Sequence, residues 1–316
     1  MLAFGHFLSE KSRKTGKICL SKGRSLKVLQ LSQYSPGSSH PESIPSTEGR
    51  QIWIGTGWKM NKLLGEAAAY CQALTAHLAS EPFPGHVFVV PPFTALSTVC
   101  RETSKSPVRV GAQDAHWEEA GAFTGEISCP MIADCGAELV EMGHSERRQY
   151  FGETDTTVNL KAKAAIRNGL RPLICIGEDA DERSSGRAKD VIERQVTSAL
   201  DGIEAGAAGR IIFAYEPVWA IGEGAQSASP EIANGIAGHV RKLLRIHLGP
   251  EWGETVPVLY GGSVNAGNAA GYLLQPEVDG LFIGRAAWKV EGFIEILGLT
   301  RDALASAGQL SRGTGS

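Results

Sequence analysis

The sequence predicts an α/β protein whose main body is one closed (β/α)8 barrel. Short apolar segments alternate with amphipathic segments from residue 51 onwards, which is typical of strands separated by helices. Strands connected in this way pair in parallel and are covered by the helices. Eight such units within about 250 residues fit one closed barrel better than two domains. A doubly wound open sheet is the alternative, but no G-x-G-x-x-G motif follows the first strand.

Each expected strand is a short apolar run followed by an amphipathic or Ala-rich segment. The strands are expected, in chain order, at residues 51–56, 86–90, 108–112, 138–142, 172–176, 210–215, 256–260 and 280–283. The helices are expected between and after them, at residues 63–80, 93–103, 129–135, 156–168, 188–200, 230–247, 266–274 and 290–297. The barrel domain should therefore span residues 51–308, with a frayed tail at 309–316.

Residues 1–50 differ in composition from the rest of the chain. They are rich in Ser, Lys and Gly, and residues 35–45 carry the Pro, Gly and Ser of an unstructured stretch. Up to His40 the only acid is Glu10, so the segment resembles an organelle transit peptide, although it lacks the apolar region of a secretory signal. We expect a disordered extension or leader; an upstream start codon read as the true one is the alternative.

Composition excludes several classes of function. The hydrophobic fraction of 42% and charged fraction of 21% are ordinary for a soluble globular protein. A net charge of -3 argues against general nucleic-acid binding, and no apolar run is long enough to span a membrane. The six cysteines are scattered without a C-x-x-C pair, which favours reduced thiols in a cytosol-like compartment and a cytoplasmic location.

The sixth expected strand ends in a carboxylate. Its apolar run, residues 211–215, leads directly to Glu216 and then to Pro217, which cannot continue the strand ladder. Gly222 and Gly224 follow, where a loop can hinge. A carboxylate at the mouth of a buried strand beside a hinged loop suits a general base under a lid. The alternative is a strand-end glutamate in an ion pair.

Three further groups lie at strand ends, where barrel enzymes place their active sites. Lys59 can hold an anion or polarise a carbonyl; the alternative is a solvated lysine. His144 stands where a helix would begin, with Ser145 as its cap, and a helix N-terminus favours a neutral ring; the alternative is a core histidine. The segment 261–263, Gly-Gly-Ser, suits a phosphate cradle of backbone N–H groups, or a simple turn.

A base, a neutral acid, a cation and a phosphate cradle at one rim suit proton abstraction next to a carbonyl in a small phosphorylated sugar. No histidines and carboxylates cluster at metal-ligand spacing, so neither a metal nor another cofactor is expected.

Five segments carry a resemblance to a known family. Residues 58–61, 143–148, 151–153, 214–222 and 260–264 read WKMN, GHSERR, FGE, AYEPVWAIG and YGGSV. Together they resemble triosephosphate isomerase, a TIM barrel, over roughly residues 51–300. The resemblance implies that Glu216 moves the proton, that His144 is the neutral electrophile, that Lys59 supports the enediolate and phosphate, and that Glu146 orients Lys59. It also implies lid and phosphate contacts at Gly222, Ser263 and Gly284.

The same resemblance implies a homodimer, because members of this family are usually dimeric and reach into the partner through the third loop. Here that loop carries residues 121–126, so Thr124 and Glu126 are candidate interface residues, along with Arg147. The only other expected partner is the small phosphorylated sugar, with no nucleic acid and no membrane.

The chain departs from the family pattern in places that we expect to face the substrate. Gly57 stands where the family has Asn, and Arg285 follows Gly284 where the family has a second Gly. The lid sequence at 222–228 and the segment at 113–117 also differ. Losing the Asn side chain opens space beside Lys59, and Arg285 adds a cation near the phosphate or refills lost volume.

A substrate one carbon longer than a triose would use that space. Residues 53–62 and 284–288 resemble the tetrulose-phosphate branch of the family, which shifts a ketone between two middle carbons. This resemblance implies conversion of L-erythrulose 1-phosphate to D-erythrulose 4-phosphate. The triose reaction is the alternative, and a non-catalytic phosphate-binding barrel is the third possibility.

Overall fold

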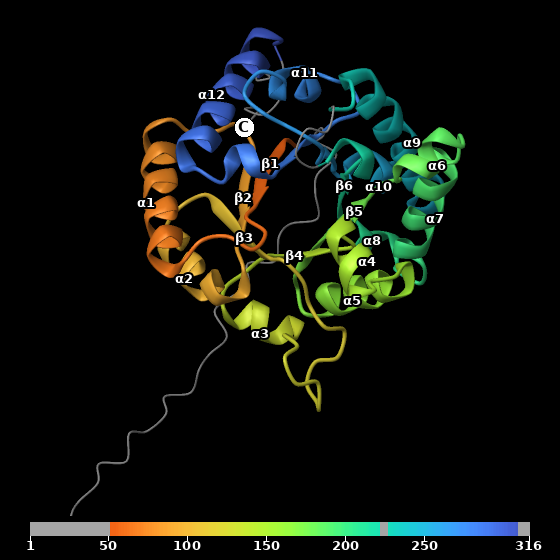
Figure 1. The fold of residues 1–316 in the computed structure, drawn as a ribbon, viewed down its shortest axis with the longest axis horizontal. Coiled ribbons are helices and arrows are strands. Elements are labelled where there is room, and N and C mark those ends of the chain that lie inside the picture. Colours follow the sequence, from red (N-terminus) through yellow and green to blue (C-terminus); the bar gives the residue numbers. More distant parts are fainter. Residues whose placement is uncertain (1–50, 222–226, 309–316) are drawn as a thin grey trace, which may run out of the picture. The chain divides into compact units, whose positions relative to one another are not determined.

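A closed ring of parallel strands forms the centre of the molecule, in the order β1 to β8 (Figure 1). The computed structural model describes residues 51–221 and 227–308. The expected extension at 1–50, the expected lid residue Gly222 with its neighbours to 226, and the tail at 309–316 lie outside the described residues. Within the described part, the predicted barrel is confirmed.

The strands are short, and β1 pairs with both β2 and β8, which closes the ring. Their bounds are β1 Trp53–Gly57, β2 His86–Val90, β3 Val108–Ala112, β4 Leu139–Met142, β5 Arg171–Ile176, β6 Ile212–Tyr215, β7 Val258–Tyr260 and β8 Gly280–Ile283. All eight lie at their predicted places, with shifts of at most two residues at the ends.

Helices surround the ring on its outside (Figure 1). Those that were predicted are α1 Leu64–Ser80, α2 Phe93–Thr103, α3 Cys129–Asp134, α5 Asp155–Arg167, α7 Ala188–Leu200, α9 Pro230–Leu248, α11 Ala269–Leu273 and α12 Val290–Ser306. The helix expected to begin at His144 is α4 Ser145–Phe151, and the structure adds α6 Ala180–Ser184, α8 Ala205–Ala208, α10 Pro250–Thr255 and the 3-10 turns η1 Val218–Ala220 and η2 Arg285–Ala287. Among the described helices, none combines the length and apolarity needed to cross a bilayer.

The last helix is longer than predicted, ending at Ser306 rather than near residue 297. The prediction stopped before Gly298, which has low helix propensity. Tertiary packing overrides that preference, because Thr300 and Leu304 are buried in the continuing helix. The Thr300 hydroxyl also donates to the Ile296 carbonyl at 2.8 Å, so its polar group is satisfied.

Two apolar clusters follow from the alternation of side chains along each strand. One joins the outward-facing strand residues to the helices. The other consists only of strand residues and fills the barrel, and it includes Trp53, Phe88, Leu173 and Phe282. Gly55 makes this filling possible, since a Cβ there would lie 2.3 Å from the Phe88 ring. The barrel is therefore a packed core rather than a channel.

The same alternation carries two acids into the barrel mouth. Leu139 belongs to the interior cluster and Val140 to the outer one, so Glu141 faces inward. Ala214 likewise faces inward, so Glu216, two residues further on, points to the same interior. Two carboxyl groups thus meet at the end of a mostly apolar barrel.

Candidate active site

A cavity of about 440 Å³ opens at the carboxyl ends of the strands. It is lined by residues at the carboxyl ends of β1, β4 and β8 and by residues that follow β1, β4, β6, β7 and β8, as expected of this barrel. Of the predicted site residues it brings together Gly57, Lys59, His144, Glu146, Glu216, Ser263, Gly284 and Arg285. Groups separated by more than 200 residues in the chain therefore share one hollow.

His144 presents one defined ring nitrogen to this cavity. It is the N-cap of α4, and its Nδ1 accepts a hydrogen bond from the Glu146 backbone N–H at 3.1 Å. Since an N–H can only donate, Nδ1 carries no proton, and in the neutral ring the proton is on Nε2. The prediction that Ser145 caps this helix is wrong, because the imidazole itself is the cap.

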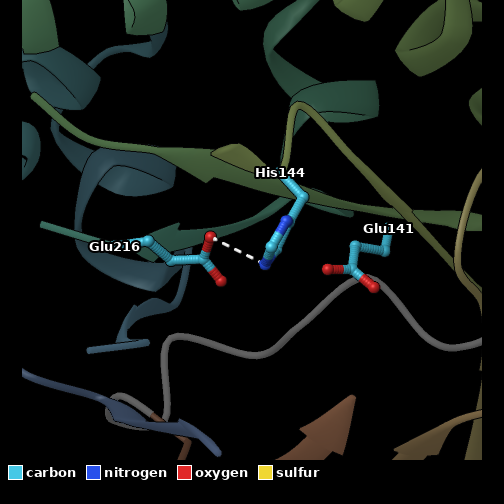
Figure 2. A group of neighbouring side chains, drawn as sticks. All are labelled: Glu141, His144 and Glu216. Atoms are coloured by element: carbon cyan, nitrogen blue, oxygen red, sulfur yellow. Dashed lines mark ion pairs between the residues drawn. The ribbon is translucent and has the colours of Figure 1, made fainter. Parts of the chain in front are cut away.

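Glu216 lies beside that ring nitrogen. Its Oε2 is 3.5 Å from His144 Nε2 and has no hydrogen-bond partner among the described residues (Figure 2). The side chain is only 4% exposed. Gly261 provides its room, because a Cβ there would lie 2.7 Å from Glu216 Cγ. A buried carboxylate oxygen without a partner, aimed into a cavity, is poised to accept a proton.

Lys59 supplies a positive charge to the cavity. It has a φ of 51°, a left-handed conformation that is uncommon for a residue with a side chain. Its Nζ lies 2.8 Å from Glu146 Oε1, so the ammonium group is held in place by an acid in the first turn of α4. Both side chains are partly exposed, so we expect the pair to orient the cation more than to stabilise the fold.

The opposite wall offers groups for an anion. Among the described residues no hydrogen bond uses the N–H groups of Gly262 and Ser263, whereas Gly261 donates to the Tyr215 carbonyl. The Ser263 hydroxyl donates to the Ala220 carbonyl at 2.7 Å, which ties β7 to the loop after β6. Arg285 lies on the same wall. Unused backbone donors beside a guanidinium suit a phosphate.

Gly57 shapes the floor beside these groups. Its carbonyl accepts a hydrogen bond from Trp288 Nε1 at 3.1 Å. A Cβ at this position would lie 3.0 Å from Phe282 Cζ and 3.9 Å from Glu141 Oε2. A side chain here would press against the Phe282 ring and reach toward Glu141, so the glycine keeps this corner of the cavity open.

Glu141 is the cavity residue that the sequence analysis missed. It stands inside β4, whereas the candidates indicated by the sequence lie at or after strand ends. A charged residue within the apolar run Leu139–Met142 was the available signal. Burial raises the pKa of this carboxyl from 4.5 to about 7, with His144 opposing and Glu216 adding to the shift.

This shift predicts a pH-dependent stability. The folded protein holds the Glu141 proton more tightly than the unfolded chain, so stability falls as the pH rises from about 4.5 to about 7. The difference corresponds to about 3 kcal/mol. Glu141→Gln should therefore be more stable than the parent at pH 8 by up to about 3 kcal/mol, with the gap narrowing toward pH 5. Chemical denaturation at both values checks this; parallel pH profiles would contradict it.

Not every predicted position faces the cavity. Asp114 turns away and pairs with Lys161 at 2.6 Å and with Arg147 at 2.5 Å. His116 is buried and stacks on Trp117 with ring centroids 4.2 Å apart. The expectation that all departures from the family pattern face the substrate is thus wrong for residues 113–117, because a buried ion-pair network holds this segment.

Three cavity groups approach one another closely enough to hold a cation. One ligand atom each from Glu141, His144 and Glu216 lies within 4.8 Å of the others, with the two carboxyls on either side of the imidazole (Figure 2). The sequence spacing did not indicate this cluster, because its members come from β4 and from the loops after β4 and β6. Two acids beside a histidine suit proton transfer as well as metal binding.

Comparisons with known proteins agree with this geometry. The sequence model of the family described as triosephosphate isomerase matches residues 52–300. Proteins named L-erythrulose-1-phosphate isomerase from Mesorhizobium japonicum and Rhizobium etli are 50% and 54% identical over 253 residues. These alignments cover 80% and 78% of this chain, and 98% and 91% of the relatives. A solved triosephosphate isomerase from Bartonella henselae has 34% identity and a TM-score of 0.72, over 79% of this chain and 99% of its own.

Proposed function

Because the chain belongs to the triosephosphate isomerase family, we propose that it is the isomerase that interconverts L-erythrulose 1-phosphate and D-erythrulose 4-phosphate. The observation that carries this proposal is the meeting of Glu216, His144 and Lys59 in one cavity, together with relatives about half identical that bear the tetrulose-phosphate name. The ketone moves between the two middle carbons, so no redox cofactor or metal is needed.

The proposed reaction transfers one proton between neighbouring carbons. Glu216 Oε2 removes the proton from carbon 3 of L-erythrulose 1-phosphate, while His144 Nε2 donates to the oxygen on carbon 2. The electron pair of the broken C–H bond forms the double bond of an enediol. Glu216 then returns its proton to carbon 2, and the hydroxyl proton of carbon 3 goes back to the histidine, which leaves the ketone at carbon 3.

Charge that develops on the two oxygens needs a fixed cation. Lys59 supplies it, and Glu146 keeps the ammonium group in position through their 2.8 Å contact. Backbone N–H groups of Gly262 and Ser263 bind the phosphate, with Gly284 leaving room and Arg285 adding charge. Gly222, outside the described residues, is proposed to begin a lid over this cavity.

We also propose a cytoplasmic homodimer that works in carbohydrate metabolism, in breakdown of erythritol-type sugars or, with a triose, in glycolysis. The loop between β3 and α3 extends away from the barrel, and Thr124 and Glu126 lie exposed on it (Figure 1). Arg147 forms ion pairs with Asp114 and Glu153, and we propose that it also contributes to the interface. Sedimentation equilibrium checks the dimer.

Exchange with solvent tests the proposed chemistry. The full chain is incubated with L-erythrulose 1-phosphate in D2O, and the sugar phosphates are followed by NMR. A carboxylate base that exchanges its proton with solvent between its two transfers should place deuterium at carbon 3 of the D-erythrulose 4-phosphate formed. Product without deuterium, and recovered substrate without deuterium, would indicate a hydride shift and contradict the assignment of Glu216 as a base.

The triose reaction is the second candidate. Its support is the 34% identity to a solved triosephosphate isomerase, together with the presence of the same base, histidine and lysine. The two substrates share the phosphate and the enediol, and differ by one hydroxymethyl group. Selectivity must therefore come from the part of the cavity that this group would occupy.

A further inference from the structure

We propose that the Glu141 carboxyl binds the terminal hydroxymethyl group of the sugar, in the space left by Gly57, and so selects a four-carbon over a three-carbon substrate. The inference rests on the proposed function and assigns Glu141 a binding role rather than a role in proton transfer.

Glu141 lies on the side of the ring opposite the last strand, because β4, which holds Glu141, stands opposite β8 in the ring of eight strands. The phosphate groups, Ser263 and Arg285, follow β7 and β8. Glu216 and His144 lie close to Glu141, and Figure 2 places His144 between the two carboxyls. A sugar anchored by its phosphate and reacting at Glu216 therefore extends its free end toward Glu141.

The substrate has one group to place there. In a tetrulose phosphate the two reacting carbons are flanked by the phosphate-bearing CH2 on one side and by CH2OH on the other. A triose phosphate has only hydrogen on that second side. The space between Phe282 and Glu141, which a side chain at residue 57 would enter, matches this extra group in position.

The Glu141 carboxyl accepts little hydrogen bonding from the described residues. The only side-chain hydrogen bond to its oxygens among the described residues comes from the Cys175 thiol, 3.8 Å from Oε1. Burial raises the pKa of Cys175 well above its ordinary value, so it remains a weak S–H donor. A buried carboxyl with so little hydrogen bonding is costly unless a ligand completes it. An alcohol both donates and accepts, so it suits either protonation state of Glu141.

The selectivity for a four-carbon over a three-carbon substrate follows from the Glu141 carboxyl and the space beside Gly57. A triose leaves the Glu141 carboxyl with only the weak Cys175 thiol donor among the described residues and leaves the space empty, and a site built to bond a hydroxyl rejects an analogue without it. An apolar residue at 141 should remove this discrimination, and a Gln should retain part of it through its amide oxygen.

The test compares one substrate and one shorter ligand on the full chain. In Glu141→Leu, kcat/KM for L-erythrulose 1-phosphate should fall about 100-fold, and in Glu141→Gln about tenfold. The inhibition constant of dihydroxyacetone phosphate, which has no hydroxymethyl group beyond its two reacting carbons, should change less than about threefold in both variants. Glu178→Gln is the matched control: Glu178 is buried at the same end of the barrel, bonded to Tyr215 and Trp219, and does not line the cavity. In Glu178→Gln, the ratio of kcat/KM for L-erythrulose 1-phosphate to the inhibition constant of dihydroxyacetone phosphate should stay that of the parent.

Three results would overturn the proposal. If kcat/KM for L-erythrulose 1-phosphate and the binding of dihydroxyacetone phosphate weaken by the same factor, Glu141 shapes the site rather than binds the hydroxymethyl group. The Gln variant provides this measurement even if the Leu variant does not fold. Failure of the unmodified chain to convert L-erythrulose 1-phosphate would remove the proposed function and this inference together. Conversion by the parent with unchanged constants in both variants would remove the inference alone.

Discussion

Glu216→Gln is expected to lower kcat by about 10³-fold, because it removes the carboxylate that accepts the proton while retaining its shape. Glu216 has a free, buried Oε2 next to His144, and this makes it the best-placed base in the cavity. The amide fits the same space under Gly261, so the melting temperature should change little. Steady-state kinetics with L-erythrulose 1-phosphate measure the loss.

Glu141 is the competing base, since its carboxyl lies in the same cavity. Glu216→Asp serves as the matched variant: it keeps a carboxylate but withdraws it by one CH2, so activity should lie between that of the parent and that of the Gln variant. If the Gln variant is as active as the parent, Glu216 is not the base.

Lys59→Met is expected to lower kcat/KM by about 10²- to 10³-fold, because a fixed cation stabilises the developing enediolate more strongly than the substrate. Met has a similar length but no charge. The partner Glu146 is 44% exposed, so water can solvate it after the change, and stability should fall by less than about 1 kcal/mol.

Lys62→Met provides the control for this prediction. Lys62 is three residues away and lies over the Trp58 and Tyr70 rings, outside the cavity lining. Its loss should lower kcat/KM by less than about tenfold. Equal effects of the two substitutions would show that Lys59 contributes only to the local fold and not to the chemistry.

Most of the barrel could be predicted because its local signals agree with its global fold. β2, β3 and β8 begin and end at the predicted residues. The short helices α6, α8 and α10 escaped prediction because four to six residues are too few for a periodic pattern.

The candidate site was predictable where topology alone decides position. Lys59, His144 and Glu216 follow different strands, and the carboxyl ends of parallel strands meet at one rim. Side-chain direction beyond the strand end was not predictable. Asp114 follows β3 in the same way, yet it turns to Lys161, because that partner comes from α5 and only the folded chain brings it near.

The most direct test of the account compares kcat/KM of the purified full chain for L-erythrulose 1-phosphate and for glyceraldehyde 3-phosphate under the same conditions. The account predicts a higher value for the tetrulose phosphate, since the cavity offers a carboxyl and a glycine to its extra hydroxymethyl group. A higher value for glyceraldehyde 3-phosphate would contradict it and leave the triose reaction as the function of this cavity.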